Sequence, residues 1–294
     1  MVLPFSSTVT GVYASESTCT TSIDILMLCS QLRILVRPRH RPHHELHFHS
    51  QAQDVSFPSL KRLEWWHNNE AERTGGINSL TAVLTGASNL NYLFVAGGAG
   101  HAKLSPGHLS LPNLTTLRLR LPDGLLLYYI VHRWTLPALT HLILDLPSSP
   151  QSFLMIWDKF GSQIRTIELG KHLRFLLEDS ISPCIRGCTS LEEINYYAQF
   201  TAPPELRQAH YSLRTVGLRH AANPYLTMLG SSWSSLELHF NTLLGPHLPL
   251  LRRIVLYGDW GEVVAHPRFQ PILERSVREG RFIVYPDGSR VSNE

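Results

Sequence analysis

The feature that most constrains the fold of this chain is a short recurring phrase with apolar residues at its first, fourth and sixth positions, as in LxxLxL. The interval between copies is about 20 to 30 residues, the range of leucine-rich repeats. Ten copies begin at Leu32, Leu60, Leu90, Leu114, Leu139, Ile164, Leu191, Leu213, Trp233 and Leu251. The first copy has Arg37 at its third apolar position, so we expect it to be an end repeat.

The spacing inside the phrase predicts one short buried strand per copy. The fourth and sixth residues are two apart and point to the same face of an extended segment, while the first tucks under as the chain turns in. Fourth-position anchors such as Leu117 and Leu142 should therefore be almost fully buried. Prolines just before several copies prevent a helix from running into the strand. We predict an α/β fold, a leucine-rich-repeat solenoid with a curved parallel sheet and short helices and loops on its convex side.

Helical periodicity between the phrases predicts helices at 152–160, 173–184 and 271–279. The last is the clearest, because Pro271 suits a first helical turn and Gly280 can end the helix. Its apolar stripe consists of Ile272, Leu273 and Val277. The FIVY segment at 282–285 then reads as a terminal strand.

The chain divides into three parts by sequence: a poorly defined segment at 1–21, the solenoid at 22–285, and a polar tail at 286–294. Within the solenoid, residues 37–56 are rich in histidine, arginine and proline and read as a solvated insertion. His43, His47 and His49 could meet a transition metal, but a loop broken by prolines lacks the fixed ligand spacing of a specific site. We expect no metal site.

The composition limits the classes of function. With 43% hydrophobic and 17% charged residues the chain is globular, and a net charge of +3 makes no single-sign field for nucleic acid. The four cysteines lack the paired spacing of a secreted scaffold, and the first residues lack the basic and apolar regions of an export signal. No apolar stretch approaches the roughly 20 residues that a membrane helix needs. We expect an intracellular protein of the cytoplasm or nucleus.

No motif in the sequence predicts catalysis. The GGAG run at 97–100 follows a predicted strand but lacks the GK[ST] ending of a phosphate-binding loop. Cys184 and Cys188 are separated by three residues, unlike a redox or zinc pair. Neither a GxSxG elbow nor an HExxH helix occurs. We therefore expect neither an enzyme nor a bound cofactor.

Residues at the third, fifth and seventh positions of each phrase should point away from the core and line the concave face. Trp, Tyr and Arg dominate binding energy at interfaces, so this face is the predicted partner-binding site. Its candidate residues are Trp66, Tyr92, Phe94, Arg118, Arg120, His141, Asp145, Tyr197, Arg219 and Tyr257. The first five should form one patch on three successive strands. Alternatively, the aromatic residues of this patch are covered by loops of their own chain.

The LPxLxxLxL wording, the irregular spacing, the scattered tryptophans and the EGRFIVY ending resemble the leucine-rich-repeat region of fungal F-box-like proteins of the basidiomycete type. The resemblance covers roughly residues 22–285, although a regular asparagine ladder after the strands is missing. It implies a protein-binding scaffold like the substrate-recognition repeats of ubiquitin-ligase receptors. A stand-alone or truncated repeat protein with no ubiquitin role is the alternative, and an enzyme or a nucleic-acid binder is a more distant one.

In the family that the chain resembles, an N-terminal F-box helix bundle binds the Skp adaptor of a cullin ubiquitin ligase. The first residues here do not show the LPxEI opening of that bundle. We predict that this chain alone does not bind a Skp adaptor. Size-exclusion chromatography of the two purified proteins should show separate peaks, and stoichiometric co-elution would contradict the prediction.

Overall fold

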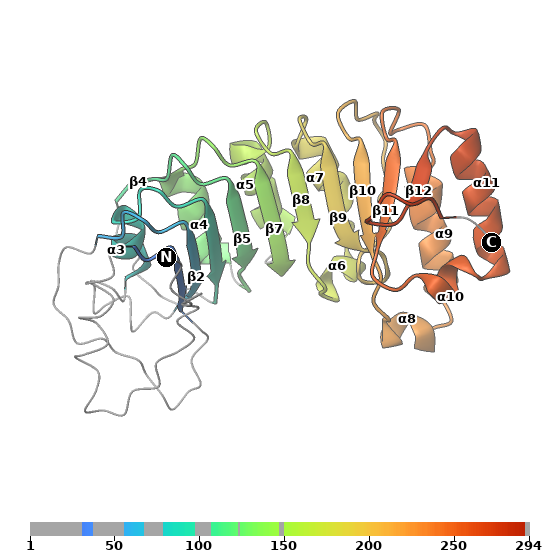
Figure 1. Ribbon diagram of the computed structural model, residues 1–294, viewed down its shortest axis with the longest axis horizontal. Coiled ribbons are helices and arrows are strands. Elements are labelled where there is room, and N and C mark those ends of the chain that lie inside the picture. Colours follow the sequence, from blue (N-terminus) through green and yellow to red (C-terminus); the bar gives the residue numbers. More distant parts are fainter. Residues whose placement is uncertain are drawn as a thin grey trace, which may run out of the picture. The chain divides into compact units, whose positions relative to one another are not determined.

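A computed structural model of the chain describes residues 31–37, 56–67, 79–97, 107–122, 124–146 and 150–291 (Figure 1). Two compact units, residues 1–139 and 140–294, each combine parallel strands with helices. The segment predicted at 1–21 and the histidines of the predicted insertion lie outside the described residues. In the described part, no helix is long and apolar enough to cross a membrane.

In the first unit, parallel strands pair in the order β1, β2, β3 and β5. Their bounds are β1 (Ile34–Arg37), β2 (Arg62–Trp66), β3 (Tyr92–Ala96) and β5 (Thr116–Arg120). A separate short parallel ladder joins β4 (Leu109–Ser110) to β6 (Trp134–Thr135). The helices described in this unit are α3 (Leu80–Thr85) and α4 (Gly124–Arg133).

In the second unit, six parallel strands pair in chain order. They are β7 (His141–Leu146), β8 (Thr166–Leu169), β9 (Glu193–Tyr197), β10 (Thr215–Arg219), β11 (Arg253–Tyr257) and β12 (Phe282–Val284). Four helices lie along one side of these strands, α5 (Pro150–Phe160), α7 (Ile181–Gly187), α9 (Ser232–Leu243) and α11 (Gln270–Arg278) (Figure 1). Shorter turns of helix are α6 (Arg174–Leu177), η2 (Ala198–Phe200), α8 (Pro224–Met228), α10 (Gly261–Val264) and η3 (Pro267–Phe269).

The phrase sets the register of both groups of strands. Each strand from β1 to β11, apart from the short β4 and β6, begins at the third residue of a phrase. The cause is a repeated hydrogen-bond pattern, in which the carbonyl of the second residue accepts two N–H groups from the next phrase. The Lys61 carbonyl, for example, accepts from the N–H groups of Asn91 at 2.9 Å and Tyr92 at 3.0 Å. Equivalent positions therefore stand opposite one another within each unit.

The anchors are buried as predicted. Leu117 is 1% exposed and Leu142 is 0% exposed, and the first-position leucines from Leu60 onward are equally enclosed. In most phrases the N–H of the first anchor donates to the carbonyl three residues before it, as from Leu60 to Phe57 at 3.1 Å. This tight turn brings the first anchor under the strand that follows.

His210 replaces that turn in the phrase at Leu213. Its Nδ1 accepts the Leu213 N–H at 3.1 Å, and its Nε2 lies 3.0 Å from the carbonyl oxygen of Cys188. Because a carbonyl can only accept, Nε2 donates to Cys188, while Nδ1 accepts from Leu213. Cys188 occupies the turn of the preceding phrase, so this buried ring joins two consecutive repeats.

A short side-chain ladder also joins repeats, although not at the positions after the strands where the sequence lacks an asparagine ladder. The residue just before the first anchor donates to a carbonyl in the turn of the preceding phrase. The bonds are Asn89 to Pro58 at 2.9 Å, Asn113 to Ser88 at 3.1 Å, and Ser212 to Thr189 at 2.9 Å. These bonds link the turns of consecutive phrases to one another.

The strand predicted at Trp233 was wrong, because this phrase lies in helix α9. The buried residues of α9 are Leu236, His239, Phe240 and Leu243, which recur with the three- and four-residue spacing of one helix face. Only Leu236 of this phrase's apolar residues is among them, and the sixth residue, Leu238, is 55% exposed. Leu213 and Leu251, the anchors on either side, are consequently 38 residues apart.

The helix predicted at 173–184 is two helices, α6 and α7. Glu178 is extended between them, and the Asp179 carboxylate accepts the N–H groups of Ile181 at 3.0 Å and Ser182 at 2.9 Å. This capping starts a new helix and ends the periodic run early.

The last predicted helix is confirmed as α11, and Gly280 follows it with a φ of +66°. The predicted stripe is only partly correct, because Val277 is 70% exposed, whereas Leu273 and Ser276 are buried. The predicted terminal strand is also confirmed as β12.

Two predicted boundaries need correction. Arg37 is not part of a solvated insertion, because it belongs to β1, is buried, and has its Cζ 4.5 Å from the centroid of the Trp65 ring. The polar tail does not begin at residue 286. Arg290 pairs with Val284, and the Val291 N–H donates to the Ile283 carbonyl at 3.0 Å, so this segment folds back onto β12.

We predict that replacing Leu117 or Leu142 by Ala lowers the free energy of unfolding by roughly 2 to 5 kcal/mol, because a cavity opens among packed anchors. Urea denaturation followed by circular dichroism would measure the change. Leu125→Ala and Leu177→Ala are matched controls, since these leucines are 40% and 73% exposed. Equal losses in the buried and exposed variants would contradict the prediction.

His239 is enclosed beneath the second unit's strands, on α9. Its Nε2 donates to the Thr201 carbonyl at 2.9 Å, and the Tyr196 hydroxyl donates to its Nδ1 at 3.2 Å. Burial lowers the pKa of His239 from 6.5 to about 4, because the charged ring would lose its hydration. Burial likewise raises the pKa of Tyr196.

We predict that the second unit loses stability as the pH falls from about 6.5 towards 4. In this window the unfolded chain binds a proton at His239 and the folded chain does not, so the free energy of unfolding rises with pH. At 1.36 kcal/mol per pKa unit, the loss is about 3 kcal/mol. Urea denaturation of His239→Gln should show a flatter pH dependence than the unaltered chain. The exposed His132→Gln serves as control, and identical pH profiles for the unaltered chain and His239→Gln would refute this assignment.

Candidate functional site

The outer face of each unit is defined here as the side of its strands that carries the third, fifth and seventh residues of the phrases. On β2, β3 and β5 these residues stand in three rows across the strands. The rows are Arg62, Tyr92 and Thr116; Glu64, Phe94 and Arg118; and Trp66, Ala96 and Arg120. The five residues predicted to form one patch therefore lie together in the first unit.

Aromatic rings and guanidinium groups stack within this patch. The rings of Trp66 and Phe94 meet edge to face, with centroids 5.9 Å apart and an interplanar angle of 86°. The Cζ atom of Arg118 lies 5.1 Å from the Phe94 centroid, and that of Arg120 lies 5.8 Å from the Trp66 centroid. Arg118 thus packs on a ring of β3, and Arg120 packs on a ring of β2. These contacts restrict the rotamers of the arginines and of the rings.

A second group lies in the row nearest the start of the strands. The Cζ atom of Arg62 is 4.3 Å from the centroid of Tyr92. Arg62 also forms an ion pair with Glu64, with 2.8 Å between Nε and Oε1. Glu64 is thereby engaged within its own strand.

Phe94 does not offer the contact surface that was predicted for it. It is only 7% exposed, because Trp66 and Arg118 pack around it, whereas Trp66 and Tyr92 are half-buried and Arg120 is exposed. Phe94 is thus covered by side chains of the neighbouring strands, and not by the loops that the alternative expectation named. Phe94 acts as a support, and the accessible surface belongs to the residues around it.

On the outer face of the second unit, Glu168 bridges two of the predicted residues. Its Oε1 lies 3.0 Å from His141 Nε2, and its Oε2 accepts from Arg219 Nη2 at 2.6 Å. The three residues come from β7, β8 and β10, so the contacts cross several strands. Glu168 was not among the predicted site residues, although the fifth position of the Ile164 phrase indicates it directly.

The predicted aromatic residues of this unit flank the same arginine. Tyr197, Arg219 and Tyr257 are opposite one another on β9, β10 and β11, and Arg219 Cζ is 5.9 Å from each ring centroid. Asp145 occupies the seventh position on β7, and its Cα would be 2.7 Å from a Cβ added to Gly170. All five residues predicted in this unit therefore lie on its outer face.

Gly217 makes the close packing of this face possible. A Cβ at this position would lie 1.8 Å from Asn195 Oδ1 and 2.7 Å from Tyr257 Cε2. The space above the glycine is thus filled by the side chains of the neighbouring strands. Its single hydrogen in place of a side chain, at the fifth position of LRTVGL, was the sequence signal for this approach.

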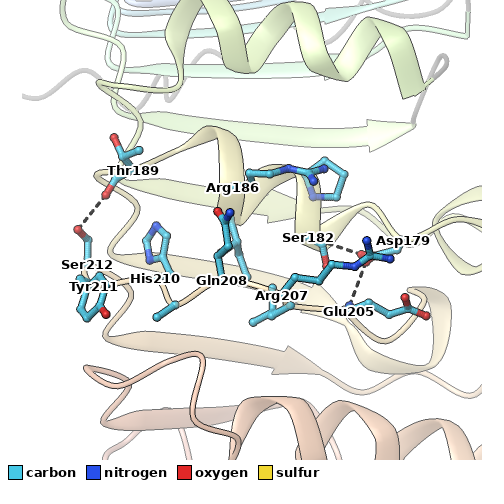
Figure 2. A pocket seen from close by; sticks show the side chains of 14 residues that line it. Asp179, Ser182, Arg186, Thr189, Glu205, Arg207, Gln208, His210, Tyr211 and Ser212 are labelled. Atoms are coloured by element: carbon cyan, nitrogen blue, oxygen red, sulfur yellow. Dashed lines mark hydrogen bonds between the residues drawn. The ribbon is translucent and has the colours of Figure 1, made fainter.

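A hollow of about 630 Å³ lies on a different part of the second unit, between α7 and the segment 205–212 (Figure 2). The Asp179 carboxylate, which caps α7, also accepts the Glu205 N–H at 3.0 Å, and Ser212 is bonded to the Thr189 carbonyl. Arg186 and Arg207, both exposed, stand in its lining. The hydrogen bonds of Asp179 and Ser212 hold the segment against the helix, so they are structural.

The other sequence candidates have structural explanations where they are described. Among the described residues, no group of three or more His, Cys, Asp or Glu side chains is placed to hold a metal ion. Cys184 and Cys188 are buried, and burial raises the pKa of Cys188 to about 12 and that of Cys184 well above its usual value. Gly97, with a φ of +102°, turns the chain close to the backbone of His67, while residues 98–100 lie outside the described part.

Comparisons with known proteins were made at three levels. No protein-family model matches the chain, and neither the curated proteins nor the solved structures contain a match.

Proposed function

We propose that this chain is a leucine-rich-repeat protein that binds a protein partner through the outer face of its first unit. Repeated phrases of fixed wording that each give one parallel strand, with equivalent residues opposite one another, support the solenoid interpretation. The anchor residues are buried and cannot contact a partner. The outer-face positions differ in residue type from one phrase to the next, so we place the binding residues there.

The observation that carries the proposal is the stacking of Trp66 and Arg118 on Phe94, and of Arg120 on Trp66. Ordering a flexible arginine or tryptophan on binding costs conformational entropy, and side chains that are already stacked avoid much of this cost. A half-buried tryptophan beside arginines also has the composition of an interface hot spot. The patch is thus prepared for contact by packing within its own unit.

The outer face of the second unit is proposed as an additional contact surface, through His141, Asp145, Tyr197, Arg219 and Tyr257. Its charged groups contact one another, because Glu168 lies within ion-pair distance of both His141 and Arg219. A partner would have to compete with these contacts. Single substitutions here should consequently have smaller effects on binding than those in the first unit.

In the leading interpretation, which follows from the resemblance to F-box-like repeats, the partner is a substrate protein that is held for ubiquitination. A repeat protein with the same binding face and no ubiquitin role is the alternative. The two interpretations differ in what happens to the partner in cells. Loss of this protein should slow the ubiquitination of the partner in the first case and leave it unchanged in the second.

We predict that Trp66→Ala and Arg118→Ala each weaken partner binding by about 2 kcal/mol or more, which is roughly thirtyfold, while the fold is retained. Cross-linking with quantitative mass spectrometry would identify a partner captured by the unaltered chain. Titration calorimetry with that purified partner would then give the affinities.

Tyr211→Ala and Arg207→Ala are the matched controls, because they remove an exposed aromatic residue and an exposed arginine away from the outer face. Thermal melts by circular dichroism would show whether each variant folds. The proposal is wrong if folded Trp66→Ala and Arg118→Ala variants bind the partner as tightly as the controls do.

A further inference from the structure

The edge of β12 that lies opposite β11 is covered by a segment of the same chain, residues 286–291. This segment is called the cap here, and the edge that it covers is called the far edge of β12. β12 is the last of the six paired strands of the second unit. We propose that the cap closes a strand-binding edge, and that the far edge, once uncapped, pairs with the β12 of a second copy of this chain.

The backbone of β12 directs alternate residues to its two edges. The Phe282 N–H donates to the Arg252 carbonyl at 2.8 Å, which places the polar groups of Phe282 on the side of β11. Those of Ile283 and Tyr285 therefore point to the far edge. Exposed N–H and carbonyl groups on a sheet edge are a template for pairing with another strand.

The cap forms the hydrogen bonds that an added antiparallel strand would form. The Ile283 carbonyl accepts the Val291 N–H at 3.0 Å, and the Tyr285 N–H donates to the Ser289 carbonyl at 2.9 Å. A pair of such bonds on either side of two facing residues is the pattern of an antiparallel ladder. The far edge is thus occupied by backbone of its own chain.

The loop that returns the chain has the sequence of a tight hairpin. Pro286, Asp287 and Gly288 follow one another, and Gly288 has a φ of +86°, as in three-residue hairpin loops that end in a left-handed glycine. The Gly288 N–H donates to the Tyr285 carbonyl at 2.9 Å. The Asp287 carboxylate accepts the Ser289 N–H at 2.9 Å and the Ser289 hydroxyl at 2.7 Å.

Two side chains add to the attachment of the cap. Val291 is 9% exposed, so the cap ends in a buried residue. The Cζ atom of Arg290 lies 4.3 Å from the centroid of the Phe282 ring. A short two-stranded hairpin is marginally stable by itself, so these side chains decide whether the cap stays closed.

A second β12 fits the far edge in the direction that the cap already has. The cap runs antiparallel to β12, with Arg290 opposite Val284. When the β12 of a second copy lies antiparallel with the two Val284 residues opposite one another, the Ile283 carbonyl of each copy accepts the Tyr285 N–H of the other. The two groups that the cap bonds are then bonded in both copies. The pairing has the two-fold symmetry of most homodimers.

The residues of β12 suit strand pairing. Its sequence, FIV, consists of one aromatic and two β-branched residues, which favour strands. It contains neither a charged residue nor a proline, the residue types that protect exposed sheet edges in other proteins. Protection of this edge therefore depends on the cap, and an uncapped edge favours a second identical strand.

Sedimentation velocity over a series of concentrations tests the proposal. Two uncapped variants are compared with the unaltered chain: a chain that ends at Asp287, and the full chain with Val291→Asp, which puts a charge at a buried position. Val277→Asp is the matched control, because this valine is 70% exposed. Self-association of the uncapped variants should have its midpoint at a concentration at least tenfold lower than in the unaltered chain and the control. Circular dichroism would show that each variant is folded.

A disulfide trap tests the register of the pairing. Opposite residues between the hydrogen bonds of an antiparallel pair have Cα atoms about 4.5 Å apart, within the range that a disulfide can join. Val284→Cys in the chain that ends at Asp287 should therefore form a covalent dimer on mild oxidation. Phe282→Cys in the same chain should not, because the proposed register separates the two 282 positions by four residues along the strands.

Mass spectrometry of the digested dimer would identify the linked positions and separate them from links through the natural cysteines. Self-association that is unchanged by either uncapped variant would overturn the proposal. Equal cross-linking at positions 282 and 284 would overturn it too, because the strands would then lack the proposed register.

Discussion

The structure depends on one hydrogen-bonding arrangement, in which the carbonyl of the second residue of most phrases accepts two N–H groups from the phrase of the next strand. This arrangement fixes where each strand begins, and it lets the first, fourth and sixth residues of successive phrases pack on one another. Because side chains alternate along a strand, the same register aligns the remaining residues in rows on the other face. The buried anchors on one face and the rows of side chains on the other therefore have a common origin.

The outer faces of the two units use this alignment differently. In the second unit the side chains contact one another across strands, with Glu168 between His141 and Arg219, and Gly217 leaves room for Asn195 and Tyr257. In the first unit the described contacts are mainly between arginines and rings, which hold the guanidiniums in place. Side chains that are already ordered lose less conformational entropy when a partner binds, which is why the proposed contact surface was sought there.

Most strands and their inward residues could be predicted from the sequence, because the two-residue period of the phrase distinguishes the faces without any knowledge of neighbours. The prediction failed at Trp233, where the phrase lies in helix α9 and of its three apolar positions only Leu236 is buried. It also failed for Phe94, since the burial of an outward ring is decided by Trp66 and Arg118 on the adjacent strands. Side-chain contacts between repeats depend on which residues of neighbouring strands lie opposite one another. The pattern along a single strand does not contain that information.

Two buried histidines show how the helix side of the second unit is completed where the repeat becomes irregular. His210 supplies the acceptor for Leu213 that a carbonyl supplies in other phrases, and His239 donates to the Thr201 carbonyl next to η2. The role of His239 needs an uncharged ring, because a charged ring would be enclosed there without water. Acidification should consequently destabilise the second unit at this buried ring. A loss of partner binding at low pH therefore has to be compared with the His239→Gln variant before it is assigned to the proposed binding face.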